Sequence, residues 1–245
     1  MTHIIYTGTY LPAMRQGGSS PPYTLHHIPA LTTTLLTPQQ ELLTALHAAT
    51  SSPFSLIFAS RHAINSVEKL HLDMRRLTHC YCVGAKTRAH AITTLGIAPE
   101  LVLTPDEGMQ NYRGLITLLK TRSFTTPLII PSLKGTHRPF LADLGLEPEA
   151  ILQFDAYSTD PTPDLEYRLG AKLKSHHIDF IAFSSPKAVR IYAPVVKHHS
   201  HSPALASIGP TTSKAMEEAN LKSVHEASVP DLHTLFEELH LLYDT

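Results

Sequence analysis

The sequence predicts an α/β fold made of two lobes of one design, and two observations support this prediction. Short apolar runs typical of strands alternate with helical patterns along nearly the whole chain. Most of these runs are continuously apolar rather than alternating, as expected of parallel strands that helices cover on both faces. A segment of the first half also recurs in the second half. Right-handed strand–helix–strand units are therefore expected in both lobes.

The strand candidates are short, and helical patterns lie between them. The clearest helix comes last, because Leu232, Leu235, Phe236, Leu239 and Tyr243 follow helical spacing after Pro230, which suits a first helical turn. The strand candidates are residues 4–6, 56–59, 80–83, 101–103, 128–130, 151–157, 180–183, 204–208 and 223–225. Residues 27–34 and 151–159 are also expected to be extended and to cross between the lobes.

The internal repeat consists of two strand-to-helix junctions in the first half of the chain that recur in the second half. Residues 58–64, Phe-Ala-Ser-Arg-His-Ala-Ile, recur as residues 183–189, Phe-Ser-Ser-Pro-Lys-Ala-Val. Downstream, Val-Gly-Ala-Lys-Thr at 83–87 recurs as Ile-Gly-Pro-Thr-Thr at 208–212. The serine-to-glycine interval is 24 residues in both copies. Chance similarity between α/β units is the alternative, because such junctions favour Ser and Gly.

Composition narrows the class of protein. The chain has 245 residues, a formal net charge of −1 and a pI near 7.0, so it has no basic surplus for a nucleic-acid backbone. No apolar run approaches the ~20 residues that cross a bilayer. Residues 1–10 contain no Lys or Arg, unlike a secretory signal, and a cytoplasmic location is expected. Nucleic acid and membrane are thus not expected as partners.

Cysteine and histidine raise the question of a metal site. Cys80 and Cys82 alternate on a predicted strand, so both thiols are expected to be buried on one sheet face. Seven of the seventeen histidines cluster at 26–27, 176–177 and 198–201. Adjacent histidines lack the helical spacing that converges two imidazoles on one zinc. Solvated loop histidines are therefore expected, with a metal site as the minor alternative.

The repeated junctions are candidate anion sites. Ser60 and Ser185 stand where a strand ends and a helix begins, and Ser is a strong N-cap. Gly84 and Gly209 permit a tight turn before the next helix, with a threonine at the third position after each. Free N–H groups and the positive end of the helix dipole attract anions at such starts. The alternative is that these are the ordinary caps of any α/β protein.

These residues also carry a resemblance. Residues 206–212, Ala-Ser-Ile-Gly-Pro-Thr-Thr, with Ala215, Pro230 and Leu235, resemble the C-terminal signature of uroporphyrinogen-III synthases, the HemD family. Residues 57–60 and 183–186 are similar to the family's two strand-to-helix turns, and 83–87 to its first-lobe Gly-Thr turn. Residues 154–159, Phe-Asp-Ala-Tyr-Ser-Thr, resemble its interlobe strand. The resemblance spans about Pro29 to Leu239 in the family's order.

The resemblance implies two Rossmann-like lobes with parallel sheets, joined by two extended interlobe strands. It places residues 1–30 and 158–245 in lobe 1, residues 36–153 in lobe 2, and the interlobe strands at 31–35 and 154–157. It further implies a cytoplasmic, monomeric, cofactor-free lyase of haem biosynthesis, with hydroxymethylbilane as substrate and no metal. A transient hand-over from hydroxymethylbilane synthase would supply that substrate.

In that family the substrate loses its hydroxyl as water, the substituted position of ring D attacks the resulting azafulvene, and ring D closes inverted. Tyr157 matches the family's interlobe tyrosine and is the expected catalytic residue, assisting departure of the hydroxyl. Packing along the strand is the alternative role for Tyr157. The expected substrate-binding residues are Ser60, Gly84, Thr87, Ser185, Pro186, Gly209, Thr211 and Thr212.

One departure from the family pattern bears on function. The family usually opens with a strand followed by Thr-Arg and an amphipathic helix, but here Gly8 takes the place of the arginine. Residues 17–22 leave little room for a full helix, so the first strand–helix unit is expected to be short. A non-catalytic, two-lobed protein that binds tetrapyrroles or other carboxylates is the alternative function. A nucleotide-binding enzyme is disfavoured because no Gly-x-Gly-x-x-Gly follows any strand candidate.

Overall fold

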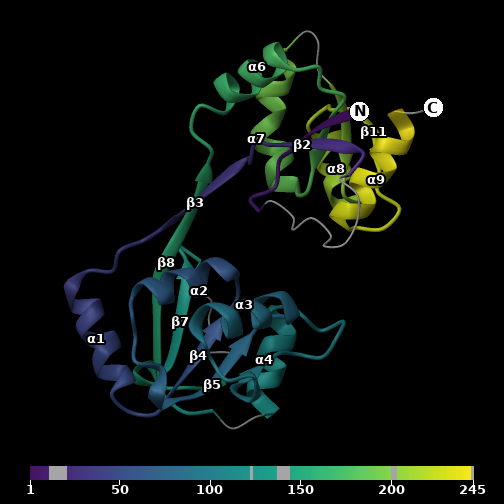
Figure 1. Ribbon diagram of the computed structural model, residues 1–245. Helices are drawn as coiled ribbons and strands as arrows, with labels where there is room; N and C mark the ends of the chain where they lie inside the picture. The colour runs from purple at the N-terminus through teal and green to yellow at the C-terminus, as the bar shows by residue number, and fades with distance from the viewer. Residues whose placement is uncertain (11–20, 122–123, 137–143, 200–202, 244–245) are drawn as a thin grey trace. The chain divides into compact units, whose positions relative to one another are not determined.

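The computed structural model describes residues 1–10, 21–121, 124–136, 144–199 and 203–243 (Figure 1). Contacts divide the chain into two compact units. Unit 1 consists of Met1–Thr32 and Asp160–Thr245, and unit 2 of Thr33–Thr159. Unit 1 is therefore built from both ends of the chain, which crosses between the units twice.

Unit 2 is built on a six-stranded sheet in the order β3-β8-β7-β4-β5-β6. Strands β8, β7, β4, β5 and β6 are paired in parallel from one neighbour to the next. The strands are β3 (Leu31–Leu35), β4 (Phe54–Phe58), β5 (Leu77–Cys82), β6 (Val102–Leu103), β7 (Leu128–Leu133) and β8 (Ile151–Pro161).

Helices bury both faces of this sheet, because successive side chains of a strand point to opposite faces. Ile57 and Tyr81 pack with Leu115 of α4 on one face. The residues next to them, Leu56 and Cys80, join the cluster of α2 and α3 on the other face. The helices are α1 (Gln40–Thr50), α2 (Arg61–Lys69), α3 (Ala85–Leu95) and α4 (Tyr112–Thr121), with 3-10 turns η1 (Met74–Arg76), η2 (Pro99–Leu101) and η3 (Pro148–Ala150).

Unit 1 is built on a five-stranded sheet in the order β11-β10-β9-β1-β2, and every neighbouring pair is parallel. The first strand lies inside this sheet, since Ile4 pairs with Phe180 of β9. Figure 1 shows the purple N-terminal strand among the green and yellow C-terminal elements. The strands are β1 (Thr2–Tyr6), β2 (Tyr23–His27), β9 (Phe180–Phe183), β10 (Ala204–Ser207) and β11 (Ser223–Glu226).

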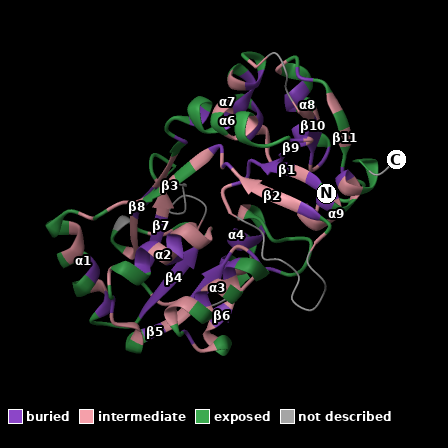
Figure 2. Ribbon diagram, turned by 45° about the horizontal axis from the view of Figure 1, so that its top comes forward, coloured by how far each residue is buried: buried purple, intermediate pink, exposed green. Residues whose placement is uncertain are grey.

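Helices cover both faces of the unit 1 sheet as well, which gives one cluster of buried side chains on each face. Ile5 and Ile181 pack with Tyr192 of α7 on one face of the sheet. Ile4 and Phe180, which point the other way, pack with the α9 residues in the second cluster. In Figure 2 the strands carry most of the buried colour, and the outer surfaces of the helices are exposed. The helices are α6 (Leu165–Ser175), α7 (Pro186–Lys197), α8 (Pro210–Glu218) and α9 (Leu232–Tyr243).

The predicted fold class is confirmed, and the differences from the predicted elements have physical causes. Strand β2 was missed because it lies at the sheet edge, where Tyr23 is buried but the following polar residues are only half covered. Helix α9 begins at Leu232 rather than at Pro230. Asp231 caps it by accepting hydrogen bonds from the N–H groups of His233 (2.9 Å) and Thr234 (3.2 Å).

The cysteine prediction is confirmed, but the histidine prediction is partly wrong. Cys80 and Cys82 are free and buried, with their sulfur atoms 3.9 Å apart, and burial raises the pKa of Cys80. His26 lies on strand β2 rather than in a loop, and its ring stacks on that of His3 (5.3 Å between centroids). In the part of the chain that the structure describes, no three His, Cys, Asp or Glu side chains are grouped to hold a metal ion.

Candidate active site

The first pair of predicted helix starts lies at the carboxyl ends of the unit 2 strands. Ser60 caps α2, and its Oγ accepts a hydrogen bond from the N–H of Ala63 at 3.2 Å. Gly84 is the N-cap residue of α3. The two starts are adjacent because Val83 donates its N–H to the carbonyl oxygen of Phe58, the last residue of β4 (3.0 Å). Both helix N-termini therefore face out from the carboxyl ends of neighbouring parallel strands.

Unit 1 repeats this geometry closely. Ser185 caps α7 and accepts from the N–H of Ala188, again at 3.2 Å, and Gly209 is the N-cap residue of α8. Ile208 donates to the carbonyl oxygen of Phe183 at 3.0 Å, as Val83 does in unit 2. The repeat seen in the sequence thus corresponds to two equivalent pairs of helix starts, one pair in each unit.

The predicted threonines differ in how far they are covered. Thr87 and Thr212 occupy the third positions of α3 and α8 and are buried, at 7% and 1% exposure. Thr211 is exposed. Pro210, like Pro186 at the start of α7, has no N–H, and the N–H of Thr212 donates to the carbonyl oxygen of Gly209 (2.9 Å). The side chain open to a ligand at the α8 start is therefore that of Thr211.

A side chain already occupies the start of α3. The N–H of Ala85 donates to Oε1 of Gln110 at 3.0 Å, so the amide oxygen sits where an anion would accept this bond. An open cavity of about 520 Å³ lies beside it. It is lined by residues 84–87, Glu107, Gly108, Gln110 and Asn111, which brings the predicted site residues Gly84 and Thr87 together.

Tyr157 contacts another predicted site residue of the same unit. It lies on β8 with 8% of its surface exposed, and its Oη accepts a hydrogen bond from Oγ of Ser60 at 2.8 Å. The ring of His62 lies 5.4 Å from the phenol ring between centroids. Neither contact could be predicted from the sequence. Ser60 and Tyr157 belong to two separate motifs, and His62 belongs to no motif other than the internal repeat.

His62 is uncharged at neutral pH. Burial, followed by the nearby charges of Arg61 and His90, lowers its pKa to about 4. Its Nε2 lies 3.2 Å from Oγ1 of Thr33 on strand β3. The imidazole therefore connects the phenol ring of Tyr157 to a second strand without adding a positive charge beside it.

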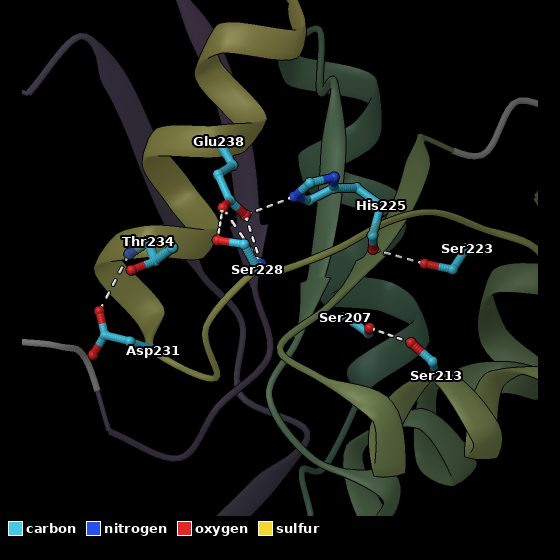
Figure 3. A network of polar contacts seen from close by, with 8 residues as sticks. All are labelled: Ser207, Ser213, Ser223, His225, Ser228, Asp231, Thr234 and Glu238. Carbon is cyan, nitrogen blue, oxygen red and sulfur yellow. Dashed lines mark hydrogen bonds and ion pairs between the residues drawn. The ribbon is translucent and has the colours of Figure 1, made fainter.

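In unit 1, Glu238 of α9 binds the segment that follows β11 (Figure 3). A second carboxylate, Glu226, is the last residue of β11 and accepts a hydrogen bond from Ser213 of α8. Glu238 of α9 accepts bonds from the N–H and the hydroxyl of Ser228 and lies 2.8 Å from Nε2 of His225. The side-chain bond from Ser228 is the main reason that the pKa of Glu238 is lowered.

This segment borders the start of α8. A Cβ added to Gly209 would lie 3.5 Å from Cβ of Pro230, an ordinary van der Waals contact. Glu226 anchors the end of β11, and Glu238 binds Ser228 within residues 227–231, so these residues form a wall next to Gly209. Neither carboxylate was predicted from the sequence to have this role.

The missing arginine at position 8 has a steric explanation. A Cβ at Gly8 would lie 1.9 Å from Oη of Tyr6 and 2.8 Å from Oγ of Ser184. The Tyr6 ring is itself held between the rings of His27 (5.7 Å) and Phe236 (5.5 Å). A residue with a side chain therefore does not fit at position 8. The expected shortening of the first helix concerns residues 17–20, which lie outside the described residues, together with Pro21 and Pro22.

The sequence matches a known family model over most of its length. The family model of uroporphyrinogen-III synthase HemD matches residues 22–237.

The chain belongs to the uroporphyrinogen-III synthase HemD family.

Solved structures of similar fold carry the same description. A uroporphyrinogen-III synthetase from Helicobacter pylori has 15% sequence identity and a TM-score of 0.61, over 99% of this chain and 100% of that chain. A mutant uroporphyrinogen III synthase from Thermus thermophilus has 16% identity and a TM-score of 0.54, over 100% and 99%. At this identity the likeness establishes the fold. A comparison with curated proteins finds no match.

The predicted family and function are confirmed at this level. Membership of the HemD family supports uroporphyrinogen-III synthase function in tetrapyrrole biosynthesis, a lyase reaction that cyclises the small molecule hydroxymethylbilane. No helix among the described residues combines the length and the apolar character needed to cross a membrane.

Proposed function

We propose that this chain performs the reaction with Tyr157 as its catalytic residue and with the repeated helix starts as binding sites for the carboxylate arms of the substrate. The observation that carries the proposal is the hydrogen bond between Ser60 and Tyr157, which places the phenol hydroxyl at one of these helix starts. Residues 1–30 with 158–245 and residues 36–153 are proposed as the two lobes, with 31–35 and 154–157 as the strands between them.

The arms of hydroxymethylbilane are acetates and propionates, and helix N-termini suit them. The starts at Ser60 and Gly84 in unit 2, and at Ser185 and Gly209 in unit 1, offer backbone dipoles without requiring Arg or Lys. At the Gly84 start, an arm takes the place of the Gln110 amide oxygen. At the Gly209 start, Thr211 contacts an arm through its exposed hydroxyl. Thr212 at the same start and Thr87 at the Gly84 start are buried and support these binding turns from below. Pro186 shapes the α7 start. Held in this way, the substrate closes in one geometry, which excludes the direct, non-inverted closure.

Tyr157 acts as the general acid in the first step. Its O–H proton passes to the hydroxyl of the hydroxymethyl group, the C–O bond breaks with its electron pair, and water leaves. The ring-A azafulvene cation remains beside the phenolate of Tyr157. After ring D has attacked, inverted and closed, the proton that the ring-D carbon loses returns to the phenolate. The net change is the loss of one water.

We also propose a location, an oligomeric state and a source of substrate for the enzyme. The protein acts as a cytoplasmic monomer without metal or cofactor, and it receives hydroxymethylbilane from the synthase that makes it by transient hand-over. Rapid transfer protects a substrate that also closes spontaneously to the non-inverted isomer.

Fresh hydroxymethylbilane tests the proposed activity. Purified protein without added metal or nucleotide should give mainly the type III isomer of uroporphyrinogen, separated from type I by chromatography. A protein-free sample gives the spontaneous isomer ratio and serves as the control. If the two ratios are equal while the protein still binds the substrate, the chain is a non-catalytic tetrapyrrole-binding relative instead.

A further inference from the structure

The hydroxyl of Ser60 makes two hydrogen bonds. It accepts one from the N–H of Ala63 at 3.2 Å and donates one to Oη of Tyr157 at 2.8 Å. A serine hydroxyl has a single proton to donate, and here that proton goes to Tyr157. A carboxylate arm can only accept hydrogen bonds. Ser60 could therefore bind an arm only by giving up its bond to Tyr157.

The bond has a direction that matters for Tyr157. Because Oη of Tyr157 accepts from Ser60, the phenol's own proton is not used in this bond and is available for donation. The ring is steadied from the side by His62, whose imidazole lies 5.4 Å away and is linked to Thr33. When the phenol loses its proton, the Ser60 donor faces the developing negative charge and strengthens as a hydrogen bond.

The equivalent serine of unit 1, Ser185, shows that a serine can cap a helix start without making this second bond. Ser185 has the same extended backbone, with φ −164° and ψ 153° against −159° and 160° at Ser60, and it makes the same 3.2 Å capping bond. Within the described residues, the hydroxyl of Ser185 has no second side-chain partner. A cap of this kind therefore does not need a tyrosine, so capping alone does not account for the Ser60–Tyr157 bond.

We infer that Ser60 is a positioning residue that acts through Tyr157: it directs the phenol hydroxyl toward the leaving group and stabilises the phenolate. This inference rests on the proposed role of Tyr157, and it replaces the expectation that Ser60 contacts the substrate directly. Ser60→Ala should then lower kcat by a factor similar to that of Tyr157→Phe, while KM stays within about threefold.

A double-mutant cycle tests the coupling. Residues that act as one unit are non-additive, so the variant with both Ser60→Ala and Tyr157→Phe should lose no more than about twofold in kcat beyond Tyr157→Phe alone. Fully multiplied losses, or a rise in KM with unchanged kcat, would overturn the inference. If Tyr157→Phe itself turns over like the wild type, the proposed role of Tyr157 fails first, which is a distinguishable result.

Three further variants separate positioning from folding. Ser60→Thr keeps both the cap and the donor and should restore kcat to within about threefold of the wild type. Ser60→Gly removes the hydroxyl with a smaller capping loss and should be as slow as Ser60→Ala. Ser185→Ala loses the matching cap, and its effect on kcat should multiply with that of Tyr157→Phe. A Ser60→Gly variant with wild-type kcat would also overturn the inference.

Discussion

The imidazoles of His3 and His26 lie side by side on β1 and β2, with Nδ1 of His3 3.0 Å from Nε2 of His26. His176 packs edge-on against His26, at 4.9 Å between ring centroids. Burial, followed by Lys172, His176 and His3, lowers the pKa of His26 to about 4. The side chains of the edge strand β2 and of its neighbour β1 are therefore joined through the His26 imidazole, which takes up a proton less readily than a free histidine does.

Acid should weaken unit 1 in a defined range of pH. The unfolded chain binds the His26 proton at its ordinary pKa of 6.5 and the folded chain at about 4, so the free energy of unfolding falls as pH drops from 6.5 to 4. Because the ring is partly exposed, about 1 kcal/mol is expected. Urea unfolding at pH 7 and pH 4.5 measures it. His26→Gln should reduce the pH dependence, and a variant with the full pH dependence of the wild type would contradict the assignment to His26.

Replacing Tyr157 by Phe removes the donor and keeps the ring. Turnover should fall by about 10²- to 10⁴-fold, the range for general acid–base groups, with little change in melting temperature. The remaining product should still be mostly type III, because the helix starts continue to hold the arms. Wild-type turnover, or a loss explained wholly by unfolding, would contradict the assignment. Slow turnover with type I product dominating would mean that Tyr157 positions ring D instead.

Thr211→Val removes an exposed hydroxyl at nearly constant volume. If this hydroxyl donates to a carboxylate arm, substrate affinity should weaken by about 1.5–3 kcal/mol, the usual contribution of a hydrogen bond to a charged group. KM or a direct binding titration measures the loss. Thr117→Val, at an exposed position on α4, is the matched control. Equal affinities for the two variants would make Thr211 an ordinary surface residue.

Gly8→Ala should destabilise the protein by about 1–3 kcal/mol, since the new methyl would overlap Oη of Tyr6. Gly170→Ala makes a useful contrast within α6. There the added Cβ meets Cε1 of His199 at 3.4 Å, and alanine favours a helix over glycine by up to about 1 kcal/mol. Thermal unfolding should therefore shift in opposite directions for the two variants. A stable Gly8→Arg variant would show that the Tyr6 ring can move aside.

Glu238→Ala should loosen residues 227–231 next to Gly209. The N–H and hydroxyl of Ser228 lose their acceptor, and His225 loses its partner. Hydrogen exchange at the Ser228 amide should accelerate by roughly tenfold, as expected when a hydrogen bond worth about 1.4 kcal/mol is lost. Leu241→Ala, at an exposed position on the same helix, is the control. Unchanged exchange would mean that Pro230 and its neighbours hold this wall without Glu238.

Sequence patterns predicted most strands because their apolar runs, such as Ile4-Ile5 and Leu128–Ile130, are buried on both faces. They failed at β2, where an edge position leaves polar residues half covered, and at the start of α9, where Asp231 caps the helix. The candidate site was predictable as far as it lies in local turns. The Ser60–Tyr157 bond joins residues 97 positions apart, and the overlap at Gly8 depends on the packing of Tyr6, so neither follows from local spacing.

The construction of unit 1 from both chain ends has a consequence for synthesis on the ribosome. Strand β1 emerges first, yet Ile4 pairs with Phe180, which is translated only after the whole of unit 2. At about 5–20 residues per second, the apolar strand waits on the order of 10–30 s for its partner. During that interval unit 2 can fold, while β1 and β2 remain a nascent segment open to chaperones. Mutations that weaken the β1–β9 pairing should therefore reduce the yield of folded protein in cells more than they reduce its stability once folded.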